Sequence, residues 1–218
     1  MFTSDHGDYF GDHWLGDKEF FHDVAAKVPL ILFDPSQHAN GTRGRVYDEL
    51  VEAIDLLPTF VDFFGGTIAD HILEGHSLLP ALHGEEAAKR EFVISEYDYS
   101  ARIFLRHLSP DAKSCNLTMV FDGRWKFIWV EGHRPILYDL ESDPKELVDL
   151  GASAEHADVR ALMERHLFDW SRRMHNRVTV SDQQVNENFC ADDARDGVYL
   201  GFWDEDELAQ WKAAQDAP

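Results

Sequence analysis

Cysteine is scarce in this sequence, and long apolar runs are absent from it. Only two of the 218 residues are cysteines, Cys115 and Cys190. Neither has a partner at zinc-ligand spacing, so we interpret both as buried or partly buried small side chains. No apolar run reaches the ~18 residues that a membrane-spanning helix requires, and the first residues lack the charged head and apolar stretch of a secretory signal. We therefore expect no disulfide framework, no transmembrane helix and a cytoplasmic location.

Basic side chains are also few. Twenty lysines and arginines stand against 41 aspartates and glutamates, which gives a net charge of −21. Such a surface repels nucleic-acid phosphates and anionic lipids, so we expect neither a nucleic-acid partner nor a membrane partner. A negative surface suits a protein that holds divalent cations, although solubility alone explains it equally well. The 44 % hydrophobic content, with 15 phenylalanines, supplies a packed core and excludes global disorder.

The beginning of the chain predicts strands. Met1-Phe2 would be the end of a strand that delivers the following polar turn. Residues 28–33 form a short, continuous apolar run with Pro29 near its start, which is typical of a buried strand in a parallel sheet. Residues 36–45 are predicted to be a loop.

Two alternatives fit the apolar residues between positions 47 and 64. One long helix would place Pro58 in its interior, at a cost of about 3 kcal/mol. We favour the other alternative, in which residues 51–54 are extended and Asp55 caps a helix with Pro58 in its first turn. Gly65 then ends that helix. A second, short helix is expected near residues 78–82.

The second half of the chain predicts a small α+β unit. Its candidate strands are residues 92–96, 118–121, 125–130 and 136–138. Asp122-Gly123, between two of them, is the strongest hairpin signal in the chain. Residues 156–174 carry apolar side chains at helical spacing: Val159, Leu162, Met163, Leu167, Trp170 and Met174. This helix would cover the apolar face of an antiparallel sheet.

We therefore predict three parts in the chain: an α/β part over residues 1–86, an antiparallel-sheet subdomain over 87–175 and a tail over 176–218. The tail is polar and acidic, but it holds a dense apolar cluster at residues 198–203. A solvated tail does not usually carry such a cluster, so we expect it to pack on this chain or on a second copy in a homo-oligomer.

The residues best suited to ligand binding or catalysis lie near the N-terminus. Asp5 and His6 are adjacent, and carboxylate and neutral imidazole are both good ligands for a divalent metal. The two can share one ion only if the backbone turns sharply, and Gly7 permits such a turn. Lys18 offers a point charge suited to a sulfate or phosphate oxygen. The remaining histidines without metal-ligand spacing are interpreted as surface or structural: His22, His38, His71, His76, His83 and His107.

Several motifs, in order, resemble the sulfatases and phosphonate monoester hydrolases of the alkaline phosphatase superfamily. The segments that carry the resemblance are 2–8, 11–13, Lys18 and 28–31 (the second sulfatase signature), 55–59, Gly65 and 75–80 (the end of the core domain), and 122–128, 137–140 and 143–146 (the C-terminal subdomain). The tail segments 177–182 and 201–203 are similar to the phosphonate monoester hydrolase and phosphodiesterase branch. Together they cover nearly the whole chain.

The resemblance implies an α/β C-terminal remnant of an alkaline-phosphatase-like core, followed by the small α+β subdomain with its antiparallel sheet and one packing helix. It also implies that Asp5 and His6 ligate a divalent metal ion (calcium, manganese or zinc), which acts as a Lewis acid. Lys18 would contact the sulfuryl or phosphoryl oxygens of a small anionic ester, and His13 would line the pocket.

The chain departs from that family at the nucleophile. The family uses a cysteine, or occasionally a serine, in a Cys-x-Pro-x-Arg motif and converts it to formylglycine, whereas neither Cys115 nor Cys190 lies in such a motif. The family's first metal-binding acid also has no counterpart. We therefore expect the chain to be the C-terminal portion of such a hydrolase and to lack turnover alone. The alternatives are a non-catalytic oligomerisation module and an independent metal-binding domain that uses Asp5 and His6.

Overall fold

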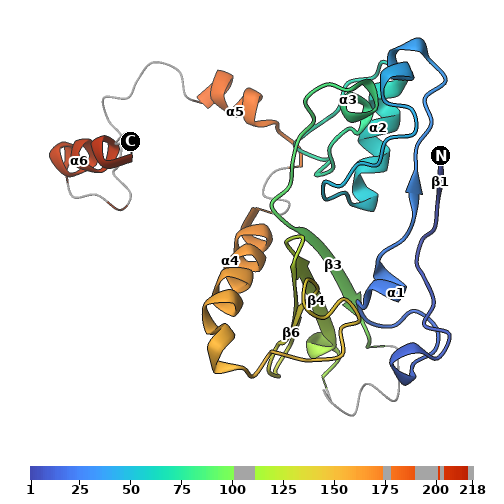
Figure 1. Ribbon diagram of the computed structural model, residues 1–218. Coiled ribbons are helices and arrows are strands. Elements are labelled where there is room, and N and C mark those ends of the chain that lie inside the picture. The colour runs from blue at the N-terminus through green and yellow to red at the C-terminus, as the bar shows by residue number, and fades with distance from the viewer. Residues whose placement is uncertain (101–110, 174–177, 190–200, 202–203, 216–218) are drawn as a thin grey trace. The chain divides into compact units, whose positions relative to one another are not determined.

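The computed structural model describes residues 1–218 except 101–110, 174–177, 190–200, 202–203 and 216–218 (Figure 1). The chain divides into two compact units, Met1–Asn176 and Arg177–Pro218. Within the described ranges, no helix combines the length and the apolar character needed to cross a bilayer. His107 and Cys190, discussed above, lie outside the described residues.

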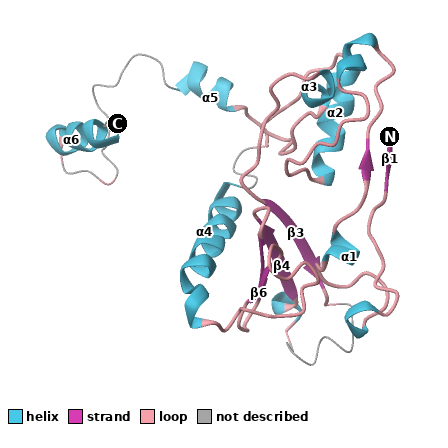
Figure 2. Ribbon diagram, in the orientation of Figure 1, coloured by secondary structure: helices cyan, strands magenta, loops and turns pink. Residues whose placement is uncertain are grey.

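An antiparallel sheet forms the centre of the first unit. Its strands, in spatial order, are β3 (Val93–Asp98), β4 (Asn116–Phe121), β5 (Trp125–Val130) and β6 (Ile136–Asp139) (Figure 2). The predicted hairpin between β4 and β5 is confirmed. Gly123 has a left-handed φ of 100°, and Asp122 accepts hydrogen bonds from the backbone N–H groups of Arg124 and Trp125. The turn chemistry therefore sets the register of the two central strands.

Each face of this sheet is covered by a different part of the chain. Helix α4 (Ala157–Arg173) confirms the predicted packing helix, and it lies beside the sheet in Figure 1. Its Met163 is fully buried in a core with side chains of β4, β5 and β6: Val120, Phe127 and Leu137. On the opposite face, Phe21 from the N-terminal segment joins Met119, Ile128 and the buried Cys115. The N-terminal segment is thus part of the core of the sheet subdomain.

Short elements make up the first ninety residues or so. They are β1 (Phe2–Thr3), η1 (Asp12–Trp14), α1 (Asp23–Ala26), β2 (Leu30–Ile31), η2 (Gln37–Gly41), η3 (Ala53–Asp55), α2 (Leu56–Phe63) and α3 (Leu79–His83). The expectation for residues 28–33 is wrong in two respects. Only Leu30–Ile31 form a strand, and it pairs antiparallel with β1. Ile31 and Phe33 are 60 % and 68 % exposed, because no described element of the chain packs over that side.

The favoured alternative for residues 51–65 is confirmed for the helix and its end, but not for its start. Ala53–Asp55 form the 3₁₀ turn η3 rather than an extended segment, and the Asp55 side chain makes no capping hydrogen bond to α2. Helix α2 starts after Asp55, holds the buried Pro58 near its beginning and is followed by Gly65 with a left-handed φ of 71°. The carboxylate of Asp55 is fully buried and forms a bidentate ion pair with Arg90. Glu52 also pairs with Arg90, at 2.9 Å, and accepts the backbone N–H of Ile94 on β3. This network ties α2 to the sheet. The expected short helix is confirmed as α3.

The second unit contains α5 (Asp182–Phe189) and α6 (Glu205–Gln215). Asp204 caps α6, since its carboxylate accepts the backbone N–H groups of Asp206 and Glu207. The apolar cluster predicted to pack, residues 198–203, lies outside the described residues except for Gly201. The packing prediction for the tail therefore stays a prediction, as does the proposed boundary at residue 86.

Candidate functional site

The polar turn after β1 brings Asp5 and His6 together as expected. Nδ1 of His6 lies 2.6 Å from the carbonyl oxygen of Gly7. Because a carbonyl only accepts hydrogen bonds, Nδ1 carries the proton and donates it, which leaves the lone pair of a neutral ring on Nε2. That Nε2 lies 3.6 Å from Oδ2 of Asp5. The turn thus presents one imidazole nitrogen and one carboxylate oxygen toward each other.

This pair fits one half of a metal site. Two ligands about 2.0–2.2 Å from a tetrahedral zinc lie roughly 3.4 Å apart, and the longer bonds of calcium allow similar separations. A backbone carbonyl that accepts from the other ring nitrogen is also the usual arrangement around a metal-ligating histidine. The described residues contain no cluster of three or more histidine, cysteine or acidic side chains able to hold a metal. Among the described residues, Asp5 and His6 would therefore be only two of the donors that such a site needs.

Lys18 lies on the same N-terminal segment and is exposed. The pKa of Asp5 is lowered, chiefly because its carboxylate accepts its own backbone N–H, and also because His6 and, to a smaller extent, Lys18 lie near it. The carboxylate is therefore ionised at neutral pH, as a metal ligand must be. Its side chain is 84 % exposed, so the donor pair opens to solvent.

Gly7 holds this turn against α1, although not for the reason that the sequence indicated. Its φ is not in the left-handed region. Instead, a Cβ at this position would lie 1.9 Å from the carbonyl oxygen of Val24, and the Gly7 N–H donates to Ala25 at 2.8 Å. Only glycine permits so close an approach of two backbones. The packing of α1 therefore fixes the position of the residues next to the donor pair.

The loop between the donor pair and α1 has an unusual backbone. Five residues other than glycine have a left-handed φ: Phe10, His13, Trp14, Asp17 and Phe20. Each such residue costs of order 1 kcal/mol or more, so the surrounding structure must stabilise the loop. Hydrogen bonds from Tyr9 N–H to Asp17 and from Gly11 N–H to Leu15, at 3.0 and 2.9 Å, close it.

His13 lies on this loop, and its ring stacks on that of His22 with centroids 3.9 Å apart. Nδ1 of His22 lies 2.7 Å from the Tyr9 hydroxyl, and Nε2 lies 3.4 Å from the hydroxyl of Tyr138 on β6. Burial lowers the pKa of His22 to about 4, and His13 and Lys126 act in the same direction. Burial also raises the pKa of Tyr138 to about 12. A neutral His22 between neutral phenols thus supports His13, and no residue spacing in the sequence indicates this role.

A buried lysine makes a second connection between this segment and the sheet. The ammonium of Lys126 on β5 donates to the carbonyl of Phe21 at 2.8 Å and pairs with Asp23 at 2.5 Å. It also pairs with the buried Glu146 at 2.6 Å, whose other carboxylate oxygen accepts the N–H of Asp23. Sequence reasoning missed the network of Asp23, Lys126 and Glu146, because Asp23 lies more than a hundred positions from both of its partners.

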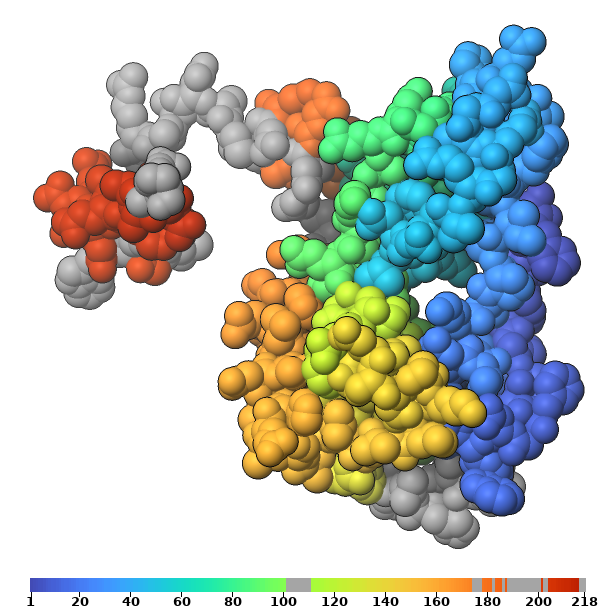
Figure 3. Space-filling view, viewed as in Figure 1, coloured from blue at the N-terminus to red at the C-terminus, as the bar shows by residue number. Residues whose placement is uncertain are grey.

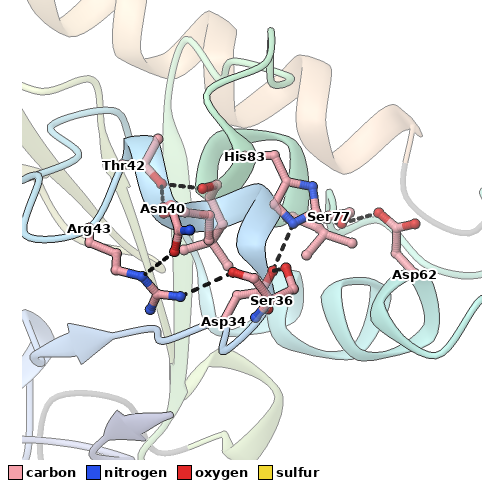
Figure 4. A network of polar contacts seen from close by, with 11 residues as sticks. Asp34, Ser36, Asn40, Thr42, Arg43, Asp62, Ser77 and His83 are labelled. Atoms are coloured by element: carbon pink, nitrogen blue, oxygen red, sulfur yellow. Dashed lines mark hydrogen bonds and ion pairs between the residues drawn. The ribbon is translucent and has the colours of Figure 1, made fainter.

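A third polar network holds the exit of β2 against α3 (Figure 4). Asp34 is buried, accepts the backbone N–H and the hydroxyl of Ser36, and lies 2.8 Å from Nε2 of His83. The Ser36 N–H and, next, the His83 ring lower the pKa of Asp34 to about 2. Arg43 donates to the Ser36 carbonyl and to Asn40. Each of these hydrogen bonds joins two residues of the network. The interpretation of His83 as a structural residue is therefore confirmed.

Comparison with known proteins covers most of the first unit. A profile of the family described as "N-sulphoglucosamine sulphohydrolase, C-terminal" matches residues 11–173. An arylsulfatase of Clostridium perfringens is 32 % identical over 159 residues, which are 72 % of this chain and 30 % of that protein. A multifunctional alkaline phosphatase superfamily protein of Trinickia caryophylli is 29 % identical over 176 residues, 78 % of this chain and 33 % of its own length.

Among solved structures, the phosphonate monoester hydrolase of Agrobacterium radiobacter superimposes with a TM-score of 0.71 at 34 % identity, over 79 % of this chain and 34 % of that chain. The chain therefore spans about a third of the length of the proteins that it matches. The fold is that of the corresponding part of these hydrolases.

Proposed function

This chain belongs to the sulfatase family described as N-sulphoglucosamine sulphohydrolase, C-terminal, and from that premise we propose that it is the C-terminal portion of a metal-dependent hydrolase of sulfate, phosphonate or phosphodiester esters. The observation that carries the proposal is the geometry of the donor pair. Nε2 of His6 is free to bind through its lone pair, and it lies 3.6 Å from an ionised Asp5 carboxylate.

Each residue has a separate role in this proposal. Asp5 and His6 hold a divalent ion, which supplies Lewis-acid chemistry when it is bound. Lys18 contacts the oxyanion of a small anionic ester through its ammonium. His13, fixed by its stacking on His22, lines the pocket. Relatives that bear the names arylsulfatase and phosphonate monoester hydrolase support an anionic ester as the substrate class.

We also propose that the chain alone has no turnover. The formylglycine of the family requires a Cys-x-Pro-x-Arg motif, which is absent from the 218 residues. Two donors and one lysine are too few groups for a preorganised site. Aryl sulfate, aryl phosphonate and phosphodiester substrates, each supplied with manganese, zinc or calcium, test this point. Robust hydrolysis by the purified chain would contradict it.

Metal binding tests the donor pair directly. In calorimetric titrations of the full chain with Mn²⁺ or Zn²⁺, we expect weak binding that Asp5→Ala and His6→Ala each reduce about tenfold or more. Asp48→Ala is the matched control, because Asp48 is an exposed carboxylate outside the turn. Equal affinities for wild type and both site variants would remove Asp5 and His6 as ligands.

The alternative function is an assembly module that forms homo-oligomers through the tail. The division of the chain into two compact units, with residues 177–218 as the second, favours a separate role for the tail. Light scattering of the chain with and without residues 176–218 distinguishes the two functions. An unchanged mass per particle would count against the assembly role.

A further inference from the structure

Three consecutive residues around the start of α1 are each held by a side chain of the antiparallel sheet. The carbonyl of Phe21 accepts a hydrogen bond from Lys126 on β5 at 2.8 Å, and the ring of His22 lies 3.4 Å from the Tyr138 hydroxyl on β6. Asp23, the first residue of α1, pairs with Lys126 at 2.5 Å. In the space-filling view, the blue N-terminal segment lies directly against the yellow part of the sheet subdomain (Figure 3).

Glu146 supplies the cap that the start of α1 otherwise lacks. His22, the residue before this helix, makes no capping hydrogen bond with its side chain. Instead, the N–H of Asp23 donates to the Glu146 carboxylate at 2.7 Å. That side chain is only 2 % exposed, and burial of a carboxylate is costly unless it is paired. Lys126, 2.6 Å from its other oxygen, provides the pair. Lys126 and Glu146 therefore fix the first residue of α1 together.

Helix α1 in turn holds the turn that carries the donor pair. The helix has only four residues, so fixing its first residue fixes the others. The Gly7 N–H donates to the Ala25 carbonyl of α1 at 2.8 Å, and a Cβ on Gly7 would meet the Val24 carbonyl oxygen at 1.9 Å. The carbonyl of Gly7 itself lies 2.6 Å from Nδ1 of His6. A displacement of α1 would therefore move the group that orients the His6 ring.

We propose that Lys126 and Glu146 are positioning residues for the donor pair: they fix the start of α1, and α1 fixes the turn of Asp5 and His6 through Gly7. Both act through other residues, across more than a hundred positions of the chain. The metal that the pair would hold rests on the proposed function, whereas the position of the turn can be measured without any metal.

Two substitutions break this connection from opposite ends. Lys126→Met removes the ammonium, and Asp23→Ala removes its partner on α1. Lys126→Met leaves the Glu146 carboxylate buried without its pair and can prevent folding. Asp23→Ala then decides alone, because the Asp23 side chain is 31 % exposed and the pair of Lys126 and Glu146 stays intact. Asp23→Asn is the conservative variant, since its amide oxygen still accepts from Lys126.

Two controls separate positioning from general effects. Lys27→Ala removes the other, exposed partner of Asp23, which lies 3.7 Å from it on the same helix. Met163→Ala destabilises the sheet from its opposite face, where Met163 is buried against Phe127. The first control tests the charge of α1, and the second tests the stability of the sheet.

Hydrogen exchange of the Gly7 N–H, followed by NMR, and calorimetric titration with Zn²⁺ are measured on the full chain. We expect Asp23→Ala and Lys126→Met to speed this exchange about tenfold or more, because the turn separates more often from α1. We expect the zinc affinity to fall about threefold or more, which is less than for a direct partner of a ligand. Asp23→Asn should restore most of both losses, and Lys27→Ala and Met163→Ala should stay within about twofold of wild type.

Unchanged exchange of the Gly7 N–H in Asp23→Ala would overturn the proposal. So would effects of Met163→Ala as large as those of Asp23→Ala, because Lys126 and Glu146 would then act only through the stability of the sheet.

Failure of the proposed function gives a different result. A wild-type chain that binds no zinc, but whose Gly7 exchange responds to Asp23→Ala and is restored by Asp23→Asn, would contradict the donor pair and leave the positioning role standing. Zinc binding that depends on Asp5 and His6, but is equal in wild type and Asp23→Ala, would overturn the positioning role and leave the donor pair standing.

Discussion

Gly7 forms the tightest backbone contact beside the donor pair, and it provides a test at the scale of one residue. A Cβ there would meet the Val24 carbonyl oxygen at 1.9 Å. We expect Gly7→Ala to lower the free energy of unfolding by about 1–3 kcal/mol, since the backbones of the turn and α1 must separate. Urea denaturation measures this change. Gly16→Ala is the control, because nothing lies within 4 Å of its Cβ. Equal stability of the two variants would show that the turn and α1 do not approach so closely.

Asp139 links one residue to the pH dependence of stability. The Arg124 guanidinium, which binds it in bidentate fashion at 2.9 Å, holds the pKa of Asp139 at about 2, below its ordinary value of 3.8. A carboxylate with a depressed pKa in the folded state stabilises the fold above its unfolded pKa and loses this effect as the pH falls. The contribution of Asp139 is therefore complete above about pH 4 and disappears toward pH 2.

We accordingly expect Asp139→Asn to be less stable than wild type at pH 7 and to approach wild type as the pH falls from about 4 to about 2. Urea denaturation at a series of pH values gives this difference. Asp48→Asn, which changes an exposed carboxylate, should follow the wild-type curve. A constant difference between Asp139→Asn and wild type down to pH 2 would mean that ionisation of Asp139 is not what stabilises the turn after β6.

At the scale of elements, α4 depends on one deeply buried side chain. Met163 is fully buried against Val120, Phe127 and Leu137, whereas its neighbour Leu162 is 42 % exposed. We expect Met163→Ala to cost about 2–5 kcal/mol of unfolding free energy, because it leaves a cavity between helix and sheet. Leu162→Ala, on the same helix, should cost less than about 1 kcal/mol. If the two variants were equally stable, the apolar stripe would not be the contact that holds α4.

The elements also show how far the sequence could predict the structure. The β4–β5 hairpin, the end of α2 at Gly65 and the whole of α4 follow from local signals, because each depends on residues close in sequence. The interpretation of residues 28–33 failed, because burial of a strand depends on what covers it. Lys126 and the contact between His22 and Tyr138 could not be predicted either, since each joins residues more than a hundred positions apart. The contact between Asp5 and His6 could be predicted because the two residues are adjacent.

At the scale of the whole molecule, the buried apolar core that the structure describes lies in the first unit. The buried apolar side chains of the described residues run from Tyr9 to Met163, and the second unit begins at Arg177. Residues 177–218 carry ten acidic and three basic side chains. Because the whole chain is strongly negative, they add net electrostatic repulsion. The stability of the first unit should therefore not depend on the second.

We expect a chain that ends at Asn176 to keep the unfolding free energy of the full chain to within about 0.5 kcal/mol, because every buried core residue that the structure describes is retained. Urea denaturation followed by tryptophan fluorescence measures this, with Trp125 and Trp129 on β5 as reporters inside the retained unit. A scrambled tail of the same composition controls for charge. A loss of 2 kcal/mol or more on truncation that the scrambled tail does not restore would show that residues 177–218 pack specifically on the first unit, as the apolar cluster at residues 198–203 predicted.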